Sequence, residues 1–501
     1  MTPKYQFTAC LLSSFLWACV ANVAQPAAAA QPAAASQPQG QGLSVAVSSA
    51  PRSLNPATTT DSAGARLLQL THPALLAYNA SYQPVGHVAQ GCTQPQATLV
   101  ECTLPAGHTF TDGAPLTAPA VAAWFAALQA EPLSPFASLK GVQVTAPTSA
   151  SVAFALPSPT LGFLGTLTEI PLANPTNPTH GAGPYRVVGH NTLGTVTLAT
   201  SHSGLPATLT FIPVADATTR LLKLKKAEVD AVFNDIPPQS VQWAKAQGFT
   251  VQAVPGLSYS YLGLNMQHPQ LANPQVRQAM AMALNRPAIR RYVLGGMASA
   301  ASTLMPPSHP AAWAAPEEPF NPAEAETLLD TTGLLRGPTT MRFSLTLLTS
   351  TDPFSQRVSQ VLQQQLRAVG IHLNLRPTEW ASFYDSVKKG HFDMVMLAWT
   401  GELPPTFYHQ AFHSTQTPPT GFNRGHVNDP RTDTLTEAIL TATTEQGLTT
   451  ATIAAQQHLA NLRPYIPLYR RHQVLITAPT VTGCTIPPSG AYTGLLTCRR
   501  N

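Results

Sequence analysis

The chain has 501 residues, of which 44% are hydrophobic and only 10% are charged, against about 25% in an ordinary soluble domain. This length predicts roughly two to four domains with sizeable cores, and the scarcity of charge excludes charge-driven disorder for the bulk of the chain. The net charge of +5 comes from 28 basic and 23 acidic residues that form no basic run, so we expect no nucleic-acid partner.

The first 30 residues have the pattern of a secretory signal peptide. One lysine precedes an apolar stretch from Phe7 to Val23, and small residues suited to cleavage follow. The apolar stretch is shorter than the ~20 residues of a membrane span. A lipoprotein signal, with L-W-A-C ending at Cys19 as lipobox, is the alternative. Residues 31–42 predict a tether rich in Ala, Pro and Gln. We expect a periplasmic or extracytoplasmic protein, soluble or lipid-anchored through Cys19.

Short strands and capped helices are predicted along the rest of the chain. Asp61, Thr117 and Asn273 each precede an apolar pattern of helical period and predict N-caps. The predicted strands are residues 44–48, 98–104, 142–144, 152–156, 229–233, 343–348, 371–375 and 394–398. The predicted helices are residues 61–70, 218–226, 274–284, 356–369 and 382–389, and one that follows Thr117 and includes residues 121–128. Alternating strands and helices in the last third indicate an α/β domain. The 48 prolines predict many rigid loops and argue against long uninterrupted helices.

The cysteines beyond the signal segment form two close pairs. Cys92 and Cys102 bracket a plausible hairpin, and Cys484 and Cys498 bracket a turn-rich loop. Two local disulfides fit an oxidising compartment, each stabilising the fold by roughly 2–3 kcal/mol. A metal site made of all four thiolates is the alternative, although the chain has no C-x-x-C spacing.

Ten stretches then match, in order, the motifs of one protein family. They are S-L-N-P at 53–56, L-P-A-G-H-T-F-T-D-G-A-P-L-T-A-P-A-V-A-A-W-F at 104–125, G-A-G-P-Y at 181–185, A-E-V-D-A-V-F-N at 227–234, Y-L-G-L-N at 261–265, V-R-Q-A-M-A-M-A-L-N at 276–285, N-P-A-E-A-E-T-L-L at 321–329, V-G-I-H-L-N-L-R-P-T-E-W at 369–380, F-D-M-V-M-L-A-W-T-G at 392–401 and I-P-L-Y at 466–469. In this order the chain resembles the extracytoplasmic solute-binding proteins of family 5, whose members serve peptide and nickel ABC importers. The resemblance covers nearly the whole mature chain.

The resemblance implies an α/β, two-lobed periplasmic binding protein fold of type II, similar to cluster C, with an inserted subdomain and a hinged ligand cleft. Lobe I would combine residues 43–74, 181–257 and 478–501, the inserted subdomain residues 75–180, and lobe II residues 258–477. The chain would cross between the lobes at Pro255–Ser260 and again near Leu475–Thr480. Ligand binding would close the lobes by a hinge motion.

The expected ligand-binding residues are Trp399, Thr400, Gly401, Glu402, Asn265, Arg52 and Ser53. The first four follow a buried strand, at the strand end where α/β sheets bind ligands. Asn265 is expected near the hinge, and Arg52 and Ser53 lie on a loop that resembles a cleft-facing loop of the family. The alternatives are a core tryptophan, a strand-end amide and a solvated surface arginine.

Two departures from the family pattern affect the expected ligand. Peptide-binding members follow W-x-G-D with a downstream D-P-D-x-F, whose first Asp holds the peptide's amino terminus. Here the run is W-T-G-E-L-P-P-T-F-Y, and the loop at 349–354 lacks the arginine that dipeptide binders use for the carboxyl terminus. We therefore expect a peptide-like solute, and not an ordinary dipeptide, because buried charges need partners.

The predicted function is capture of a peptide or other small solute by a monomer that delivers it to ABC permease and ATPase subunits. A nickel or metal-chelate binder of the same family is the first alternative, since His409 and His413 lie four residues apart and would share a helix face. The other alternative is an exported hydrolase. The sequence has no G-x-S-x-G, H-E-x-x-H or phosphate-binding loop, so we expect neither enzyme activity nor a cofactor.

Overall fold

The computed structural model describes residues 41–79, 81–337, 341–401, 404–419 and 421–501. The predicted signal peptide, the start of the tether, Cys19 and Glu402 lie outside these ranges. In the described residues no helix has both the length and the hydrophobicity to cross a membrane.

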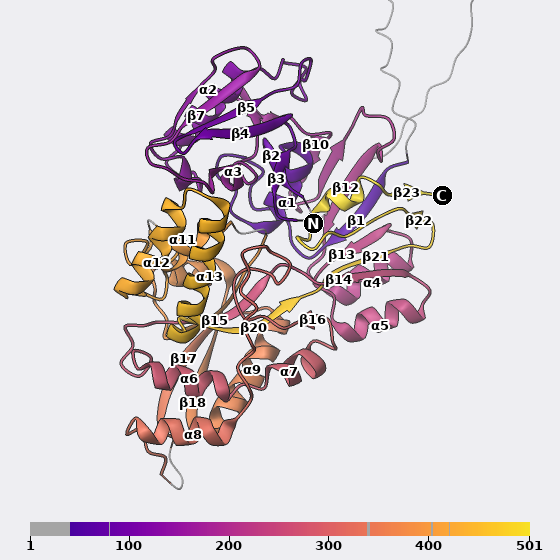
Figure 1. Cartoon of the computed structure of the whole chain (residues 1–501). Coiled ribbons are helices and arrows are strands. Elements are labelled where there is room, and N and C mark those ends of the chain that lie inside the picture. The colour runs from indigo at the N-terminus through magenta and orange to yellow at the C-terminus, as the bar shows by residue number, and fades with distance from the viewer. Residues whose placement is uncertain (1–40, 80, 338–340, 402–403, 420) are drawn as a thin grey trace, which may run out of the picture. The chain divides into compact units, whose positions relative to one another are not determined.

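A seven-stranded sheet gathers strands from both ends of the described chain (Figure 1). Its order is β10 (Arg186–His190), β11 (Val196–Ala199), β12 (Thr208–Pro213), β1 (Leu43–Val47), β13 (Ala231–Phe233), β21 (Gln473–Thr477) and β14 (Thr250–Val254). The central β1 pairs in parallel with β12 and β13. Helices α1 (Ser62–Thr71), α4 (Ala217–Lys225) and α5 (Pro238–Ala246) contribute buried side chains to its two faces. We call this sheet with its helices the first lobe.

A four-stranded sheet and its helix form a separate core between β1 and β10 of the chain. The order is β4 (Gly91–Gln96), β5 (Leu99–Thr103), β7 (Ser151–Ala155) and β6 (Gln143–Thr145), and α2 (Ala118–Ala130) packs on it. Two hairpins, β2 (Leu76–Tyr78) with β3 (Pro84–Gly86) and β8 (Ala173–Asn174) with β9 (Asn177–Gly181), and the short helices α3 (Phe163–Thr166) and η1 (Ala137–Leu139), complete this inserted subdomain.

A six-stranded mixed sheet forms the second lobe. Its order is β16 (Ala298–Ser299), β20 (Tyr465–Arg471), β15 (Tyr259–Leu264), β19 (Met394–Trp399), β17 (Phe343–Ser350) and β18 (Ile371–Thr378). Helices α6 (Pro274–Met282), α8 (Pro322–Thr331) and α9 (Pro353–Ala368) share one core with it. Helices α11 (Phe407–Phe412), α12 (Pro430–Thr441) and α13 (Glu445–Leu462) share a second core, rich in aromatic residues, and α10 (Trp380–Lys388) a third. Helix α7 (Arg286–Ala288) and the π-helical turn η2 (Ile289–Val293) follow α6.

The helix caps predicted from the sequence are confirmed. Asp61 accepts a hydrogen bond from the Gly64 backbone at the start of α1, and Thr117 and Asn273 cap α2 and α6 in the same way. The expectation that the prolines exclude long uninterrupted helices was wrong, because α9 and α13 contain 16 and 18 residues. Prolines occupy the first turn of α2, α5, α6, α8, α9 and α12, where a missing N–H costs no hydrogen bond.

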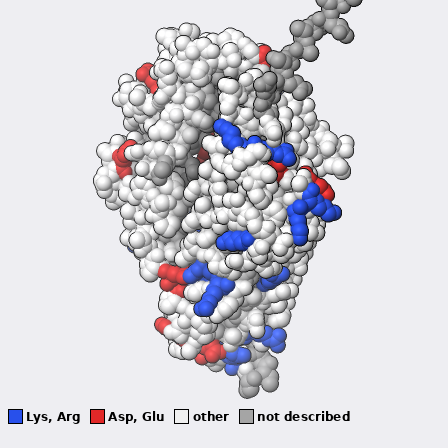
Figure 2. Space-filling view, turned by 90° about the vertical axis from the view of Figure 1, so that its right-hand side faces the viewer, with Lys and Arg blue, Asp and Glu red and all other residues white. Residues whose placement is uncertain are grey.

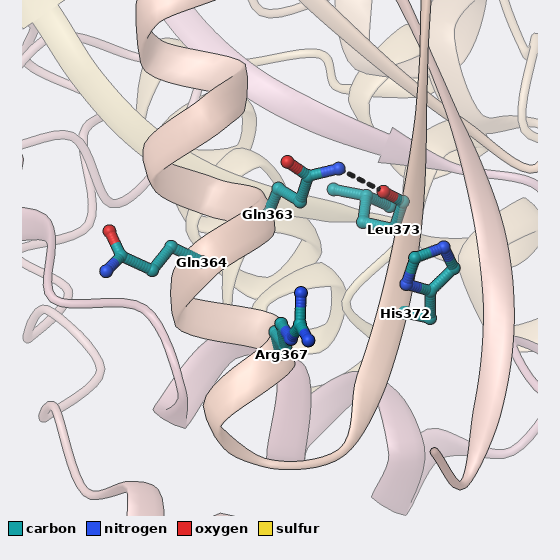
Figure 3. A pocket seen from close by; sticks show the side chains of 5 residues that line it. All are labelled: Gln363, Gln364, Arg367, His372 and Leu373. Carbon is teal, nitrogen blue, oxygen red and sulfur yellow. Dashed lines mark hydrogen bonds between the residues drawn. The ribbon is translucent and has the colours of Figure 1, made fainter. Parts of the chain in front are cut away.

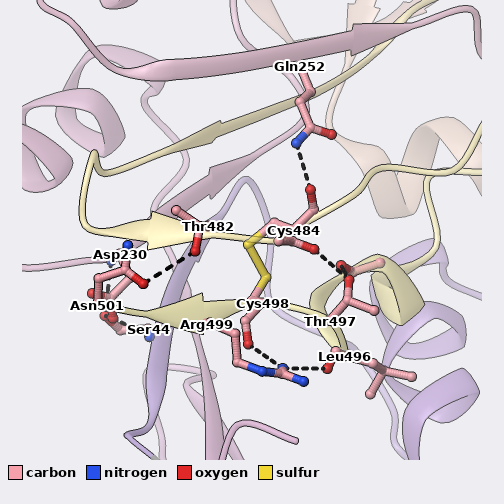
Figure 4. Close-up of a disulfide and its surroundings, with 12 residues drawn as sticks. Ser44, Asp230, Gln252, Thr482, Cys484, Leu496, Thr497, Cys498, Arg499 and Asn501 are labelled. Atoms are coloured by element: carbon pink, nitrogen blue, oxygen red, sulfur yellow. Dashed lines mark hydrogen bonds between the residues drawn. A yellow bond between two sulfur atoms is a disulfide. The ribbon is translucent and has the colours of Figure 1, made fainter.

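Both predicted disulfides are present. Cys92 and Cys102 face each other across the β4–β5 hairpin. Cys484 and Cys498 close the loop between β22 (Val481–Thr482) and β23 (Arg499–Arg500), which also contains the short helix η3 (Tyr492–Leu495) (Figure 4). Gln252 of β14 donates to the Cys484 carbonyl at 2.7 Å, so this C-terminal loop is held against the first lobe.

The chain passes between the two large sheets twice. The first crossing lies between β14 and β15, at residues 255–258. The second was expected near Leu475–Thr480, but β20 ends at Arg471 in one sheet and β21 begins at Gln473 in the other. The crossing is therefore at His472, and β21, which the predicted boundary assigned to lobe II, pairs with β13 and β14 of the first lobe.

Candidate functional site between the two lobes

Trp399 is the last residue of β19 and stands half-buried among aromatic rings of the second lobe. Its ring stacks on Tyr261 with centroids 6.2 Å apart, and meets Phe407 edge-on at 4.8 Å and Phe422 at 5.7 Å. Strand β19 is apolar and buried over its first three residues, which fixes the indole at the strand's carboxyl end. A large ring that is packed on one side and still partly exposed can serve as a wall for a ligand.

Arg424 extends this aromatic group toward the first lobe, although no sequence motif had singled it out. Its guanidinium carbon lies 4.6 Å from the centroid of Trp399 and 5.5 Å from that of Tyr384, and it donates to the Tyr384 hydroxyl at 3.3 Å. Tyr384 stacks on Trp380 at 5.9 Å, and Arg52 of the first lobe lies 5.8 Å from the Trp380 ring. Cations and aromatic rings attract each other, so the series Arg52–Trp380–Tyr384–Arg424–Trp399 connects the two lobes.

Burial makes this aromatic group resistant to ionisation. Burial raises the pKa of Tyr261 well above its ordinary value and also raises that of Tyr465, although Arg424 acts in the opposite direction on both. Trp399 Nε1 is buried without a hydrogen-bond partner of normal geometry, although the indole is close enough to the Tyr465 hydroxyl to lower its pKa slightly.

Further contacts join the inserted subdomain to the second lobe. The hydroxyls of Tyr82 and Ser308 share a hydrogen bond of 3.0 Å, and the Tyr82 ring lies against His309, tilted by 57° with the ring centroids 5.0 Å apart. Gly162, just before α3, lies so close to Thr406 that a Cβ there would be 2.7 Å from the threonine methyl group. With the contact of Arg52, these approaches touch the second lobe at three separate places.

Asp235 and Arg471 connect the lobes beside the second crossing. Arg471 Nη1 lies 3.2 Å from Asp235 Oδ1, and the Ser48 hydroxyl donates to Oδ2 at 2.7 Å. Burial alone would raise the pKa of Asp235, but Arg471, Ser48 and Arg66 together outweigh it and hold the pKa below its ordinary value. Arg471 also lies 4.6 Å from the ring of Phe354, so an arginine does stand beside the loop at 349–354.

The other expected ligand-binding residues lie in different surroundings. Thr400 is exposed, and Gly401 has φ +90° with no atom of the described residues within 4 Å of the position of a Cβ. Ser53 accepts a hydrogen bond from Asn55 N within its own loop. Asn265 follows the end of β15 that is remote from the crossing, where its amide bonds to Phe392 O and Gln267 N. The structure thus brings Arg52 and Trp399 into one series of contacts and leaves Asn265 outside it.

The two candidate metal ligands do lie together on and beside α11. The rings of His409 and His413 are 4.4 Å apart, and burial lowers the pKa of His409 to about 4. His413 Nε2 is 3.1 Å from Glu437 and its Nδ1 accepts from Thr415 N, so both its nitrogens are engaged. Across the described ranges, no three His, Cys, Asp or Glu side chains form a group that could hold a metal ion.

Two small cavities lie outside the contact between the lobes. One, of about 190 Å³, lies between α9 and the edge strand β18, where Gln363 donates to Leu373 O at 2.7 Å (Figure 3). The other, of about 180 Å³, lies within the second lobe and is lined by residues of 259–318 and 408–467. Neither contains a residue expected from the sequence to bind ligand.

Comparison with known proteins decides the family. The family of bacterial extracellular solute-binding proteins, family 5 Middle, matches residues 83–419, which is more than half of the chain. The chain belongs to this family. Members of family 5 are solute-binding proteins of transport systems located outside the cytoplasm. A probable di/tripeptide-binding protein 5 of Pseudomonas aeruginosa is 29% identical over 296 residues, covering 58% of this chain and 55% of that protein. The glutathione-binding protein GsiB of Escherichia coli K12 is 29% identical over 331 residues, covering 62% and 63%.

Solved structures show the same fold at low sequence identity. The chain spans less than two thirds of the length of the curated relatives that it matches, but it covers the solved structures almost completely. NikA from Brucella suis in complex with Fe(III)-EDTA has a TM-score of 0.82 at 20% identity, covering 91% of this chain and 100% of that one. DppA from Helicobacter pylori in complex with the peptide STSA has a TM-score of 0.80 at 17% identity, covering 93% and 99%. This family 5 protein therefore has the two-lobed α/β fold of periplasmic binding proteins.

Proposed function

We propose that this family 5 protein is the substrate-binding component of an ABC importer, which captures a peptide-like solute between its lobes and delivers it to the permease. The observation that supports this most directly is the series from Arg52 to Trp399, which joins the two lobes through two arginines and three aromatic rings. A solute that enters between the lobes would meet the half-exposed face of Trp399 and be enclosed when they close.

The proposal includes binding without chemical turnover, by a monomer that acts with permease and ATPase subunits. It also includes the division into lobe I, inserted subdomain and lobe II, with the second crossing at His472. The expected location is extracytoplasmic. Mass spectrometry of the mature N-terminus distinguishes the soluble form from the lipid-anchored form. A lipid on Cys19 adds hundreds of daltons to the N-terminal peptide, whereas cleavage near residue 30 leaves that peptide unmodified.

A thermal-shift screen followed by calorimetry tests the proposal. Tri- to pentapeptides, glutathione, nickel–histidine and Fe(III)-EDTA form the panel, since a ligand that binds only the folded state raises its melting temperature. We expect a peptide to give the largest shift and small-angle scattering to show compaction with it. Conversion of that peptide into products, or a response to the metal chelates alone, would contradict the proposal.

A further inference from the structure

The cavity of about 180 Å³ within the second lobe has the size of a site for a small ligand. Its apolar walls include the side chains of Trp313, Phe412 and Leu459. An apolar cavity of about 150 Å³ is large enough to hold a benzene ring. Pro316 and Asn461 also line the cavity and are exposed, so a small molecule can enter from their side.

One wall of this cavity carries Arg286, a buried arginine of which only 1% is exposed. Its Nη2 donates to Glu318 O, but its buried Nε has no hydrogen-bond partner in the described residues, since Glu317 Oε1 is 3.8 Å away. Two other buried arginines, Arg277 and Arg470, each donate to three backbone carbonyls. Arg286 is therefore less completely bound by the protein than they are, and an acceptor that enters the cavity would complete its hydrogen bonds.

The two glutamates beside Arg286 are each held more closely by another arginine. Arg290 binds both carboxylate oxygens of Glu317, one of them at 2.9 Å, and Arg463 Nη2 lies 2.8 Å from Glu318 Oε2. On the face of the molecule in Figure 2, charged side chains are few and several basic ones adjoin acidic ones. Arg286 lacks such a close carboxylate, and these five side chains carry one positive charge in excess.

The hydroxyl of Tyr408 is a second donor in the wall of the cavity. Tyr408 is 2% exposed, and its hydroxyl has no hydrogen-bond partner of normal geometry in the described residues, although the backbone at Leu304 and Met305 lies near it. Burial raises the pKa of Tyr408, so the hydroxyl keeps its proton and can donate it to a hydrogen bond. The cavity thus combines apolar side chains with donors that lack acceptors.

We propose that this cavity binds a small carboxylate with an apolar body, such as a short-chain or aromatic carboxylic acid. The carboxylate would lie on Arg286, where it supplies an acceptor for Nε and offsets the excess positive charge. Charge-assisted hydrogen bonds of this kind are about twice as strong as neutral ones. The apolar body would pack against the rings of Trp313 and Phe412. This site is separate from the one proposed between the lobes, because it includes neither Arg52 nor Trp399.

The experiment compares three probes of one shape and different charge. Benzoate is negative, benzamide is neutral and benzamidine is positive. Calorimetric titrations use the whole protein as wild type, Arg286→Gln, Ala460→Leu and Ala454→Leu, each shown to be folded by circular dichroism. Ala460 is half-buried and lines the cavity, so a leucine there fills it while Arg286 stays in place. The control Ala454→Leu enlarges a half-buried alanine elsewhere on α13.

We expect wild type to bind benzoate with a Kd in the millimolar range or lower, and at least about tenfold tighter than benzamide, since one charge-assisted contact is of this order. Arg286→Gln should remove the preference for benzoate and keep the affinity for benzamide. Ala460→Leu should weaken both probes by about tenfold or more, because the added methyl groups occupy the space of the ring. Ala454→Leu should bind as wild type does.

Three results for wild type overturn the inference: no binding of benzoate at millimolar concentration, equal affinity for the three probes, or tightest binding of benzamidine. A preference for benzoate that survives in Arg286→Gln also overturns it. If Arg286→Gln does not fold, Ala460→Leu still decides, because unchanged binding of benzoate in that variant shows that the ligand occupies another place. Each of these results leaves the proposed capture of a peptide between the lobes untouched.

Discussion

Truncation of Trp399 to alanine should weaken binding of the solute and also lower the stability of the fold. The indole is half-buried, so no more than about a third of the 150–250 Å² of an aromatic side chain is free to contact a ligand. At ~25 cal/mol per Å², roughly 60 Å² of lost contact corresponds to about 1.5 kcal/mol, or a ~10-fold rise in Kd. Loss of contacts with Tyr261, Phe407 and Arg424 should also lower the unfolding free energy by about 2–3 kcal/mol.

The two effects are separated by a matched control, Trp243→Ala. Trp243 on α5 is also half-buried, lies against Phe249 with the ring centroids 6.3 Å apart and has Lys225 5.7 Å from its ring, but it packs on the core that α4 and α5 share and has no contact with Trp399. The Trp243→Ala variant should lose a comparable amount of unfolding free energy but keep its affinity for the solute. Isothermal calorimetry with the peptide found by screening, on both folded variants, measures the difference. Equal affinity in the two variants would refute the assignment of Trp399 to the ligand site and show that Trp399 only packs in the core.

Removal of the Cys92–Cys102 disulfide by a double serine substitution should lower the unfolding free energy by about 2–3 kcal/mol in urea titrations, and an unchanged midpoint would contradict this. Glu169→Gln should stabilise the ligand-free protein at pH 8 but not at pH 4. The pKa of Glu169 in the folded protein, about 7, lies above the ordinary value of a glutamate, so ionisation of this carboxyl destabilises the fold progressively as the pH rises from the ordinary pKa toward 7. Solvent screens the exposed group, so the stability gained by Glu169→Gln at pH 8 should be about 1 kcal/mol or less. Thermal melts at the two pH values check it; a gain at pH 4 equal to that at pH 8 would contradict it. The valine side chain in Gly162→Val should collide with Thr406, hold the lobes apart and weaken peptide binding by ~10-fold or more. The control Gly91→Val should bind the peptide normally, because a Cβ at Gly91 would meet no atom within 4 Å. Small-angle scattering that shows equal compaction of both variants with the peptide would contradict this.

Local features of the fold could be predicted because they depend on neighbouring residues. Asp61, Thr117 and Asn273 cap helices through bonds to backbone groups two or three residues ahead, so the sequence alone contains the interaction. The hairpin between Cys92 and Cys102 is local for the same reason.

Helices α12 and α13 were not predicted because threonines hide their apolar period. Thr432, Thr436 and Thr452 are buried on the faces that pack into the second lobe. Each is acceptable there because its hydroxyl finds a local partner, as when Thr436 donates to Thr432 O at 2.9 Å and Thr452 to Leu448 O at 2.7 Å. A hydroxyl satisfied in this way behaves as an apolar surface, but it counts as polar in a sequence pattern.

The candidate site was only half predicted, since its parts meet through tertiary contacts. Trp399 and Arg52 came from motifs, but Arg424, Trp380 and Tyr384 reach the site from α10 and from a loop beyond α11. The placement of Asn265 near the hinge was wrong, because the strand that carries it runs away from the crossing and its amide terminates that strand.

The scarcity of charge makes the remaining charges around the lobes informative. Only 10% of residues are charged, and several of those between the lobes already have partners within the protein. Asp235 is bound by Arg471 and Ser48, and Arg52 and Arg424 lie on aromatic rings. The charges that connect the lobes therefore have partners within the protein, and a solute that replaces one of these contacts must supply a partner of its own, because a charge left buried without one is costly.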